Sequence, residues 1–245
     1  VNIPLLRGDA AELISVALEE RVRIVFTSAG NPEKHIIQLK ENSAVVVHVV
    51  SSVRQAVKAA RAGCDAIVGE GVEAGGHNGT DEITTLCLIP QMVDAVPVPV
   101  IAAGGIADGR QIAAVLCLGA QGVQIGTRFA ATIESSAHDQ YKQKIVASAD
   151  NGTVLAFRKV GLVRMLKNDF ALQALNAEAE GWDAARLQAL LGRKREQLGI
   201  FQGNEQEGEM EAGQSSGLVR EILTVAEVFE KLTSEYDRAM LEVVK

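Results

Sequence analysis

The sequence has few cysteines. Only Cys64, Cys87 and Cys117 occur in 245 residues, and they form neither a CxxC pair nor a zinc-ligand spacing. This pattern argues against a metal site and against a disulfide framework. Each cysteine has apolar neighbours, so we expect all three to be small buried hydrophobic residues in a reduced, cytoplasmic compartment.

Positive charge and long apolar runs are also lacking. The net charge is −7, and the sequence has no dense basic patch that would bind phosphates. This argues against a protein that binds nucleic acid or a membrane surface. The longest apolar stretches, such as AVVVHVV and VPVPVIAAGGI, are far shorter than the ~20 residues that cross a bilayer. The first residues lack the basic start and apolar core of a signal peptide. We therefore expect neither nucleic acid nor membrane as a partner.

Short β-branched runs alternate with helical patterns through the first half of the chain. Asp9 is placed to cap the first helix, and Gly63 to stop the third. The patterns predict strands at 1–6, 22–30, 44–50, 64–71, 97–106 and 122–129, and helices at 9–20, 32–42, 52–63, 85–96 and 108–120.

This alternation predicts an α/β fold with a parallel sheet, either doubly wound or a (β/α)8 barrel. No GxGxxG follows the first strand, and polar and glycine residues collect at strand ends, so we favour the TIM-type barrel. Such a barrel has eight strands, whereas six are predicted here. Either the sheet is not a closed barrel, or the chain lacks the first two strand-helix units, roughly 60 residues. We favour the second alternative.

The pattern changes after residue 133. The following segments are helical except for a candidate strand at 153–160, and 201–217 is typical of a loop. We predict three parts: 1–133 as barrel strands 3 to 8, 134–215 as a small mainly helical cap, and 216–245 as a C-terminal helix that returns to the barrel.

Two glycine turns follow the last two predicted strands. Gly104-Gly105 and Gly126-Thr127 stand where barrels commonly hold a phosphate on backbone N–H groups and a helix N-terminus. The glycines let a phosphate come close, and Thr127 adds a hydroxyl donor. The alternative is a pair of tight turns without a ligand.

A histidine lies within a glycine cluster in GEGVEAGGHNG. His77 follows two glycines, and Glu70 and Glu73 are close in sequence. A titratable cluster of this kind indicates a functional site, although a lone loop histidine often has only a hydrogen-bonding role. His48 lies in the middle of a predicted strand, and we expect it to be structural.

Several stretches together resemble a known family of flavoproteins. VNIPLL, FTSAGNP, GEGVEAGGHNG, IAAGGIADGR, GAQGVQIGTRF and EAGQ are similar to the FMN-dependent nitronate monooxygenases, formerly 2-nitropropane dioxygenases, and the FabK-type enoyl-acyl-carrier-protein reductases. The resemblance implies an FMN-binding barrel with a helical cap inserted after the last strand. It also implies an amino-terminal portion, with two further strands and flavin contacts, that this sequence lacks.

The resemblance assigns roles to individual residues. His77 matches the active-site histidine of the family, and no metal ligands are implied. The family's first glycine-methionine turn has no counterpart here, so that part of the flavin site is unassigned. The positions that match cofactor-binding residues are Asn2, Glu70, Gly75, Gly104, Gly105, Gln124, Ile125, Gly126 and Thr127.

Two features favour the reductase branch. Glu70 stands where the monooxygenases carry glutamine, and GLVRMLKNDF is similar to a VRVLKN segment of the reductases. The resemblance then implies an enoyl-acyl-carrier-protein reductase of fatty acid biosynthesis. NADH or NADPH would supply a hydride, by way of FMN, to the C2=C3 bond of a 2-enoyl thioester carried by acyl carrier protein. His77, or a water that it positions, would give the proton.

Two alternatives stay open. A nitronate monooxygenase would oxidise alkyl nitronates with FMN and O2, and His77 would then be the general base. A chain without catalytic activity would only bind a phosphorylated ligand. From the resemblance we also expect a monovalent cation and a homodimer.

Overall fold

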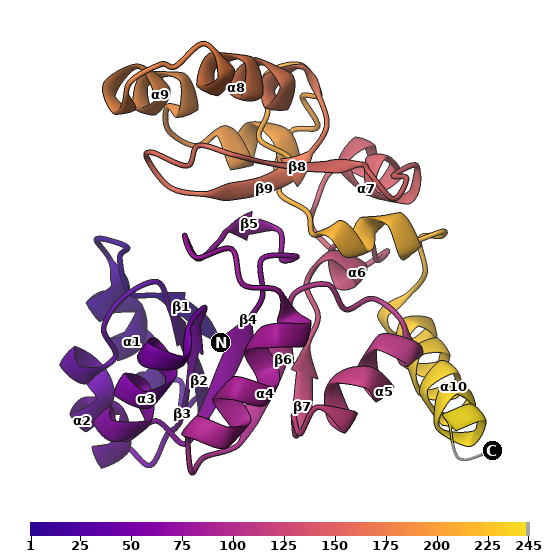
Figure 1. Cartoon of the computed structure of the whole chain (residues 1–245). Coiled ribbons are helices and arrows are strands. Elements are labelled where there is room, and N and C mark those ends of the chain that lie inside the picture. Colours follow the sequence, from indigo (N-terminus) through magenta and orange to yellow (C-terminus); the bar gives the residue numbers. More distant parts are fainter. Residues whose placement is uncertain (244–245) are drawn as a thin grey trace. The chain divides into compact units, whose positions relative to one another are not determined.

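A computed structural model describes residues 1–243 of the chain, which form two compact units (Figure 1). The sheet unit consists of residues 1–70, 83–103 and 115–124. The second unit consists of residues 71–82, 104–114 and the chain from residue 125 onward. The predicted boundaries at residues 133 and 215 stay a prediction.

The sheet unit contains one parallel sheet of six strands in the order β1-β2-β3-β4-β6-β7. Each strand lies inside a predicted run, so the α/β fold with a parallel sheet is confirmed. The closed barrel with two further units stays a prediction. The strands are β1 (Asn2–Pro4), β2 (Ile24–Ser28), β3 (Val45–Val50), β4 (Ala66–Glu70), β6 (Val100–Ala103) and β7 (Gly122–Gln124).

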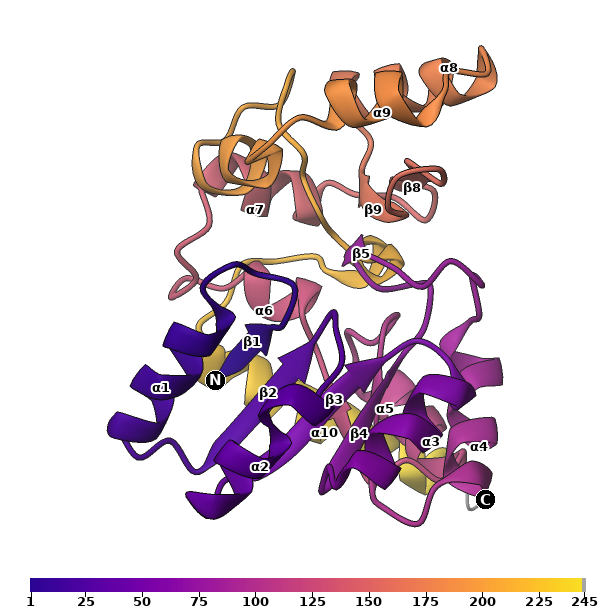
Figure 2. The same ribbon diagram turned by 90° about the vertical axis from the view of Figure 1, so that its left-hand side faces the viewer.

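The helices predicted between these strands are present. In Figures 1 and 2, α1 to α3 lie on one face of this sheet. Gly63 ends α3 at φ 104°, as predicted, because glycine adopts the left-handed conformation freely. Asp9 precedes α1, but its side chain pairs with Arg7 at 2.7 Å instead of capping the helix. The helices are α1 (Ala10–Glu19), α2 (Glu33–Glu41), α3 (Val53–Ala62), α4 (Thr85–Ala95) and α5 (Gly109–Cys117).

The second unit contains an antiparallel sheet of three strands in the order β5-β9-β8. Of these strands only β8 (Thr153–Ala156) was predicted, within 153–160; β5 (Gly76–His77) and β9 (Val163–Leu166) were not. The remaining elements are α6 (Thr127–Ala130), α7 (Asp139–Val146), α8 (Asp169–Ala179), α9 (Ala184–Leu191), the π-helix η1 (Gln197–Phe201), the 3₁₀ helix η2 (Gln214–Leu218) and α10 (Val225–Val243).

Two apolar clusters hold the second unit together. One packs β8 and β9 against α8 and includes the rings of Phe157 and Phe170, whose centroids are 5.8 Å apart. The other surrounds Tyr141 on α7 and includes Met210 and Ala212. The segment 209–213 is therefore anchored by its apolar members.

The cysteine prediction is partly wrong. Cys64 is buried, but Cys87 and Cys117 are exposed. The apolar neighbours of Cys87 do not predict its burial, because successive residues of a helix face different sides. In α4, Leu88 is buried and Leu86 is 66% exposed. Within residues 1–243, no helix combines the length and the apolar character needed to cross a bilayer. His48 is buried and its Nδ1 lies 2.7 Å from Oγ1 of Thr27, which fits its predicted structural role.

Candidate functional site

The loop after β4 carries His77 on a two-residue strand. In β5, Gly76 pairs with Arg164 and His77 with Val163 of β9. The side-chain amide of Asn78 donates a hydrogen bond of 2.8 Å to the carbonyl of Gly76 and so stabilises the turn. Gly76 has φ +80°, which a side chain would strain. The glycines thus fold the chain back so that β5 presents His77 at a fixed place.

The imidazole of His77 faces a carboxylate. Its Nδ1 lies 3.5 Å from Oε1 of Glu211, and 69% of its side-chain surface is exposed. The hydrogen bond with Glu211 raises the pKa of His77 above its ordinary value of 6.5, against the opposite effect of burial. On the other side of the ring, a Cβ added to Gly161 would lie 3.6 Å from Cδ2 of His77. The arrangement favours a protonated imidazole with one edge open to solvent.

Glu211 is held by its backbone. It bridges Met165 of β9, and its carbonyl accepts a hydrogen bond of 2.5 Å from the hydroxyl of Tyr141. Glu209, two residues earlier, is 3% exposed, and burial raises the pKa of its carboxyl to about 7. Neither glutamate is predicted from the sequence as a site residue. Glu211 begins the stretch EAGQ, which entered only the family resemblance, and Glu209 lies two residues before it.

The Gly104-Gly105 turn requires glycine at both positions. The φ angles are +90° and +76°. A Cβ on Gly104 would lie 2.7 Å from the carbonyl oxygen of Gly71, and a Cβ on Gly105 would lie 3.1 Å from Cβ of Glu73. The side-chain amide of Gln111 donates to the carbonyl of Gly105. The turn therefore packs backbone to backbone against the loop that carries His77.

The second glycine turn leads into α6. Gly126 occupies the N-cap position, where α6 has no side-chain cap, and a Cβ there would meet no atom within 4 Å. Thr127 accepts a hydrogen bond of 2.9 Å from the N–H of Gly213 on Oγ1, which leaves its own hydroxyl hydrogen to donate. Gly126 and Thr127 thus provide open space beside N–H groups that no side chain caps, a setting that can accept a phosphate.

Gly75 lies in the same unit as these turns. A Cβ at this position would come within 2.5 Å of the backbone of Ala212. Gln214 also joins the two segments, because its N–H donates to the carbonyl of Glu73 at 2.9 Å. The second unit thus brings together Gly75, His77, Gly104, Gly105, Ile125, Gly126 and Thr127.

The other predicted cofactor contacts belong to the sheet unit. Glu70 and Gln124 both pair with Ala103, so the ends of β4, β6 and β7 are level. Burial raises the pKa of Glu70 to about 7. Asn2 lies on β1, at the other edge of the sheet, and accepts a hydrogen bond of 3.5 Å from the hydroxyl of Ser28.

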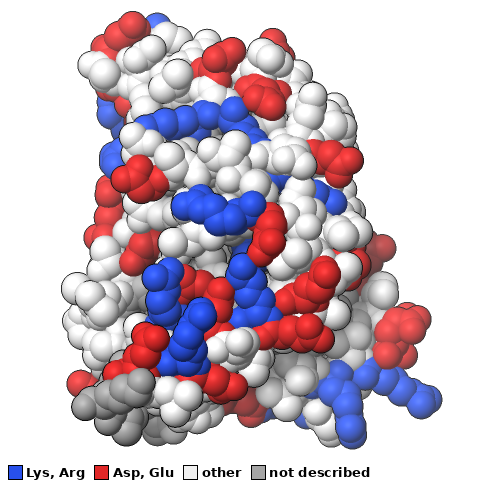
Figure 3. Space-filling view, turned by 90° about the vertical axis from the view of Figure 1, so that its right-hand side faces the viewer, with Lys and Arg blue, Asp and Glu red and all other residues white. Residues whose placement is uncertain are grey.

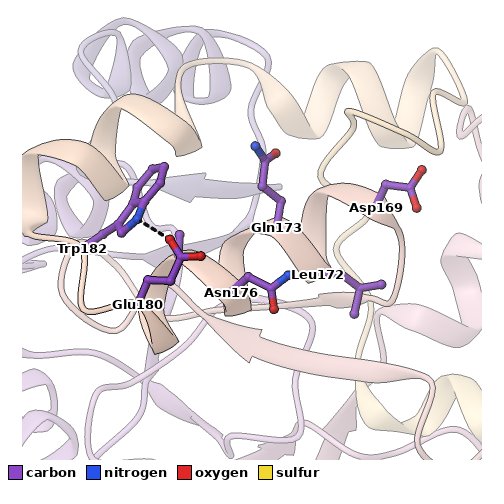
Figure 4. A pocket seen from close by; sticks show the side chains of 7 residues that line it. Asp169, Leu172, Gln173, Asn176, Glu180 and Trp182 are labelled. Carbon is purple, nitrogen blue, oxygen red and sulfur yellow. Dashed lines mark hydrogen bonds between the residues drawn. The ribbon is translucent and has the colours of Figure 1, made fainter.

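Two cavities of the second unit lie away from His77. One of 320 Å³ is lined by α8 residues and Trp182, whose indole N–H donates to Glu180 at 3.0 Å (Figure 4). The other, of 340 Å³, is lined by Arg128 and by paired charges such as Arg110 with Asp108.

Figure 3 shows acidic and basic side chains interspersed over a face of the chain. Among residues 1–243, no three His, Cys, Asp or Glu side chains gather as metal ligands.

Known proteins resemble this chain over most of its length. The sequence model of a family described as nitronate monooxygenase matches residues 2–235. A (3aS,4S,5R,7aS)-5-hydroxy-7a-methyl-1-oxo-octahydro-1H-indene-4-carboxyl-CoA dehydrogenase of Mycobacterium tuberculosis is 36% identical over 81% of this chain. A probable nitronate monooxygenase of Staphylococcus saprophyticus is 35% identical over 85%. The chain spans 57% and 62% of the length of these two curated relatives.

Solved structures are also similar. The structure of FabK from Thermotoga maritima is 40% identical, with a TM-score of 0.93 over 99% of this chain and 77% of that chain. A nitroalkane oxidase from Streptomyces ansochromogenes is 31% identical, with a TM-score of 0.81 over 97% of this chain and 71% of that chain.

Proposed function

Because the chain belongs to the nitronate monooxygenase family, we propose that it acts as an FMN-dependent oxidoreductase that reduces a 2-enoyl thioester. In this proposal His77 is the acid that protonates the α-carbon. The likeness to FabK at 40% identity over 99% of the chain supports the reductase branch. The expected departure from the monooxygenase pattern at Glu70 supports it as well.

The contact between His77 and Glu211 carries this proposal. A general acid must hold its proton at the working pH, and a carboxylate 3.5 Å from Nδ1 stabilises the imidazolium. A carboxylate at this place also stabilises the imidazolium that forms when a histidine acts as a base. The contact therefore supports proton transfer by His77, and the likeness to FabK favours donation as its direction.

The residues at the glycine turns would hold the cofactor. When bound, FMN supplies the transfer of a hydride from NADH or NADPH to the substrate. Gly104, Gly105 and Gly126 would lie against its phosphate, because glycine has no side chain to hold a phosphate away from the backbone. Thr127 would add its hydroxyl hydrogen as a donor. The remaining contacts proposed from the resemblance are Asn2, Glu70, Gly75, Gln124 and Ile125.

A nitronate monooxygenase is the second candidate. The curated relative from Staphylococcus saprophyticus and the family description support it. In that reaction His77 would act as the base toward a nitroalkane or nitronate, with O2 as the oxidant. The two candidates predict opposite effects of pH on turnover by the same residue.

The deciding experiment separates the two half-reactions. The flavin of the purified protein is reduced without oxygen by NADH or by NADPH, and is then reoxidised by a crotonyl thioester or by O2 with a nitronate. We expect the thioester to reoxidise it. Reoxidation by O2 and nitronate, with no effect of the thioester, would establish the second candidate. A colourless protein that takes up no FMN would contradict both.

The pH profile tests the role of His77. Since the pKa of His77 is raised, kcat/KM for the enoyl thioester should stay high below this pKa and fall as the pH rises through it. His77→Ala should lower turnover by ~10²-fold or more with FMN retained, and reduction by the nicotinamide should change less. His35→Ala, on α2, is the control. A rate that rises with pH would make His77 a base.

The carrier and the assembly belong to the same proposal. We propose a thioester of acyl carrier protein as the substrate, a monovalent cation as a second cofactor, a homodimer, and a cytoplasmic location. Light scattering of the purified protein tests the dimer, and turnover with and without potassium tests the cation.

A further inference from the structure

A buried carboxyl, that of Glu209, lies two residues before Glu211 in the chain. Glu209 is 3% exposed, and its Oε1 has no hydrogen-bond partner among the described residues. Burial of a carboxylate is costly, so the neutral acid is favoured, and a side-chain hydrogen bond with Glu211 acts in the same direction. The mechanism proposed above makes no use of this group.

The backbone brings Glu209 and Glu211 to the same side of their segment. Met210 accepts a hydrogen bond of 2.8 Å from the N–H of Leu166, and Glu211 forms an isolated antiparallel bridge with Met165, so this short segment lies alongside β9. In an extended chain, residues two apart point the same way. The Met210 side chain points into the apolar cluster around Tyr141. The two carboxyls therefore influence each other directly.

Among the described residues, His77 is the basic group that offsets this negative charge. The charged groups that act on Glu209 are Glu211, His77 and Glu196, so His77 is the one cation among them. Arg195 contributes only its carbonyl, which accepts from the N–H of Glu209 at 3.0 Å, while its guanidinium lies over the ring of Phe170. Glu209, Glu211 and Glu196 in turn act on His77.

We propose that Glu209 sets the charge of the His77–Glu211 pair. When Glu209 is protonated, Glu211 supplies the one negative charge of this carboxyl pair that acts on the imidazole. When Glu209 ionises, a second negative charge holds the imidazole proton more firmly. Glu209 is thus a positioning residue that acts through His77 and extends the pH range over which His77 stays an acid. The inference rests on the proposed function only for the catalytic use of that acid.

Burial raises the pKa of Glu209 to about 7, so it ionises in the range where His77 would otherwise lose its proton. As the pH rises, Glu209 becomes negatively charged, and this negative charge makes the imidazole of His77 release its proton less readily. Two groups that interact in this way titrate as a pair, and the curve of His77 should be broader than that of an isolated imidazole.

The test is an NMR titration of the whole chain labelled with 15N-histidine, in which His77→Ala identifies the signals of His77. Glu209→Gln keeps the side-chain volume and removes the ionisation. We expect it to lower the midpoint of the His77 titration by roughly 0.5–1 pH unit. Glu207→Gln is the matched control, because it removes an exposed carboxyl from the same segment. It should leave the midpoint unchanged.

Glu209→Asp keeps a carboxyl and should move the midpoint less than Glu209→Gln does. An equal midpoint in Glu209→Gln and the wild type, or an equal shift in Glu207→Gln, would overturn the proposal. If Glu209→Gln does not fold, the 13C signal of the Glu209 carboxyl in the wild type decides: a midpoint near 7 supports the proposal, and one near the ordinary 4.5 refutes it. These titrations need neither flavin nor substrate, so their failure is distinct from failure of the proposed enzyme activity.

Discussion

At the scale of the residue, Gly105 combines a positive φ with a close neighbour. Its φ is +76°, and a Cβ would lie 3.1 Å from Cβ of Glu73. Gly181 has nearly the same φ, +77°, but a Cβ there would meet nothing within 4 Å. A substitution at Gly181 therefore tests backbone strain alone, whereas the same substitution at Gly105 tests strain together with crowding at the proposed phosphate turn.

We predict that Gly105→Val releases FMN and that Gly181→Val does not. Both substitutions should lower the free energy of unfolding by about 1–2 kcal/mol or more, since a left-handed backbone disfavours side chains. FMN occupancy is measured by absorbance of the purified protein, and unfolding by urea titration. Full occupancy in Gly105→Val would show that the phosphate binds elsewhere.

Glu70 is the second residue with a measurable consequence. Its folded pKa is about 7 against an ordinary 4.5, so between these values the folded chain holds a proton that the unfolded chain has lost. Stability must then fall as the pH rises through this window. We predict that Glu70→Gln reduces the fall between pH 5 and pH 8 in flavin-free protein, measured by urea unfolding at each pH.

Glu209 should contribute a similar fall, because its pKa is also raised to about 7. Glu70→Gln therefore flattens the profile only in part. Glu12→Gln, on the exposed face of α1, is the control and should follow the wild type. Parallel profiles for Glu70→Gln and the wild type would show that Glu70 is solvated in the folded chain.

At the scale of the element, the segment 209–213 depends on α7 for its place. The hydroxyl of Tyr141 is the donor to the carbonyl of Glu211, and the tyrosine is 3% exposed. Tyr141→Phe would keep the ring in the apolar cluster and remove this donor. A buried carbonyl that loses its donor typically costs about 1–3 kcal/mol.

We predict a loss of stability of that size in Tyr141→Phe, measured by urea unfolding, together with a His77 titration closer to the ordinary one. Tyr236→Phe, at the only other tyrosine of the sequence, should change neither property. If Tyr141→Phe kept full stability, the hydroxyl would not anchor Glu211.

At the scale of the whole molecule, the three thiols report on the fold. Cys87 and Cys117 are exposed, whereas Cys64 is 3% exposed and burial raises the pKa of its thiol to about 11. Reagents attack the thiolate, so a buried thiol with a raised pKa is inert. We predict that two thiols react with a disulfide reagent at pH 8 and that the third reacts only after unfolding.

Cys64→Ala should leave the two fast reactions intact and abolish the slow one. Three equally fast thiols would show that β4 and its surroundings open readily. A single fast thiol would show that Cys87 or Cys117 is covered in solution, for example in the proposed dimer.

The sequence by itself determined where the parallel strands and the helices between them lie along the chain. Runs such as AVVVHVV and the helical spacing around Ile14 are local patterns, and burial on one or both faces leaves them visible in the chain. Glycine clusters also report local needs, because a turn or a close approach of the backbone requires glycine at particular positions. His77 and the two glycine turns are therefore identifiable from the sequence alone. The fine boundaries at 133 and 215 rest on weaker changes of composition.

Only the tertiary structure decided what faces His77. Glu209 and Glu211 lie far from it in sequence, and they approach it because a short extended segment pairs with β9 while β5 pairs with the same strand. A two-residue strand and a single bridge have no periodic signal in the sequence. The raised pKa of Glu209 likewise depends on burial by groups from distant segments, and this burial exists only once the chain has folded.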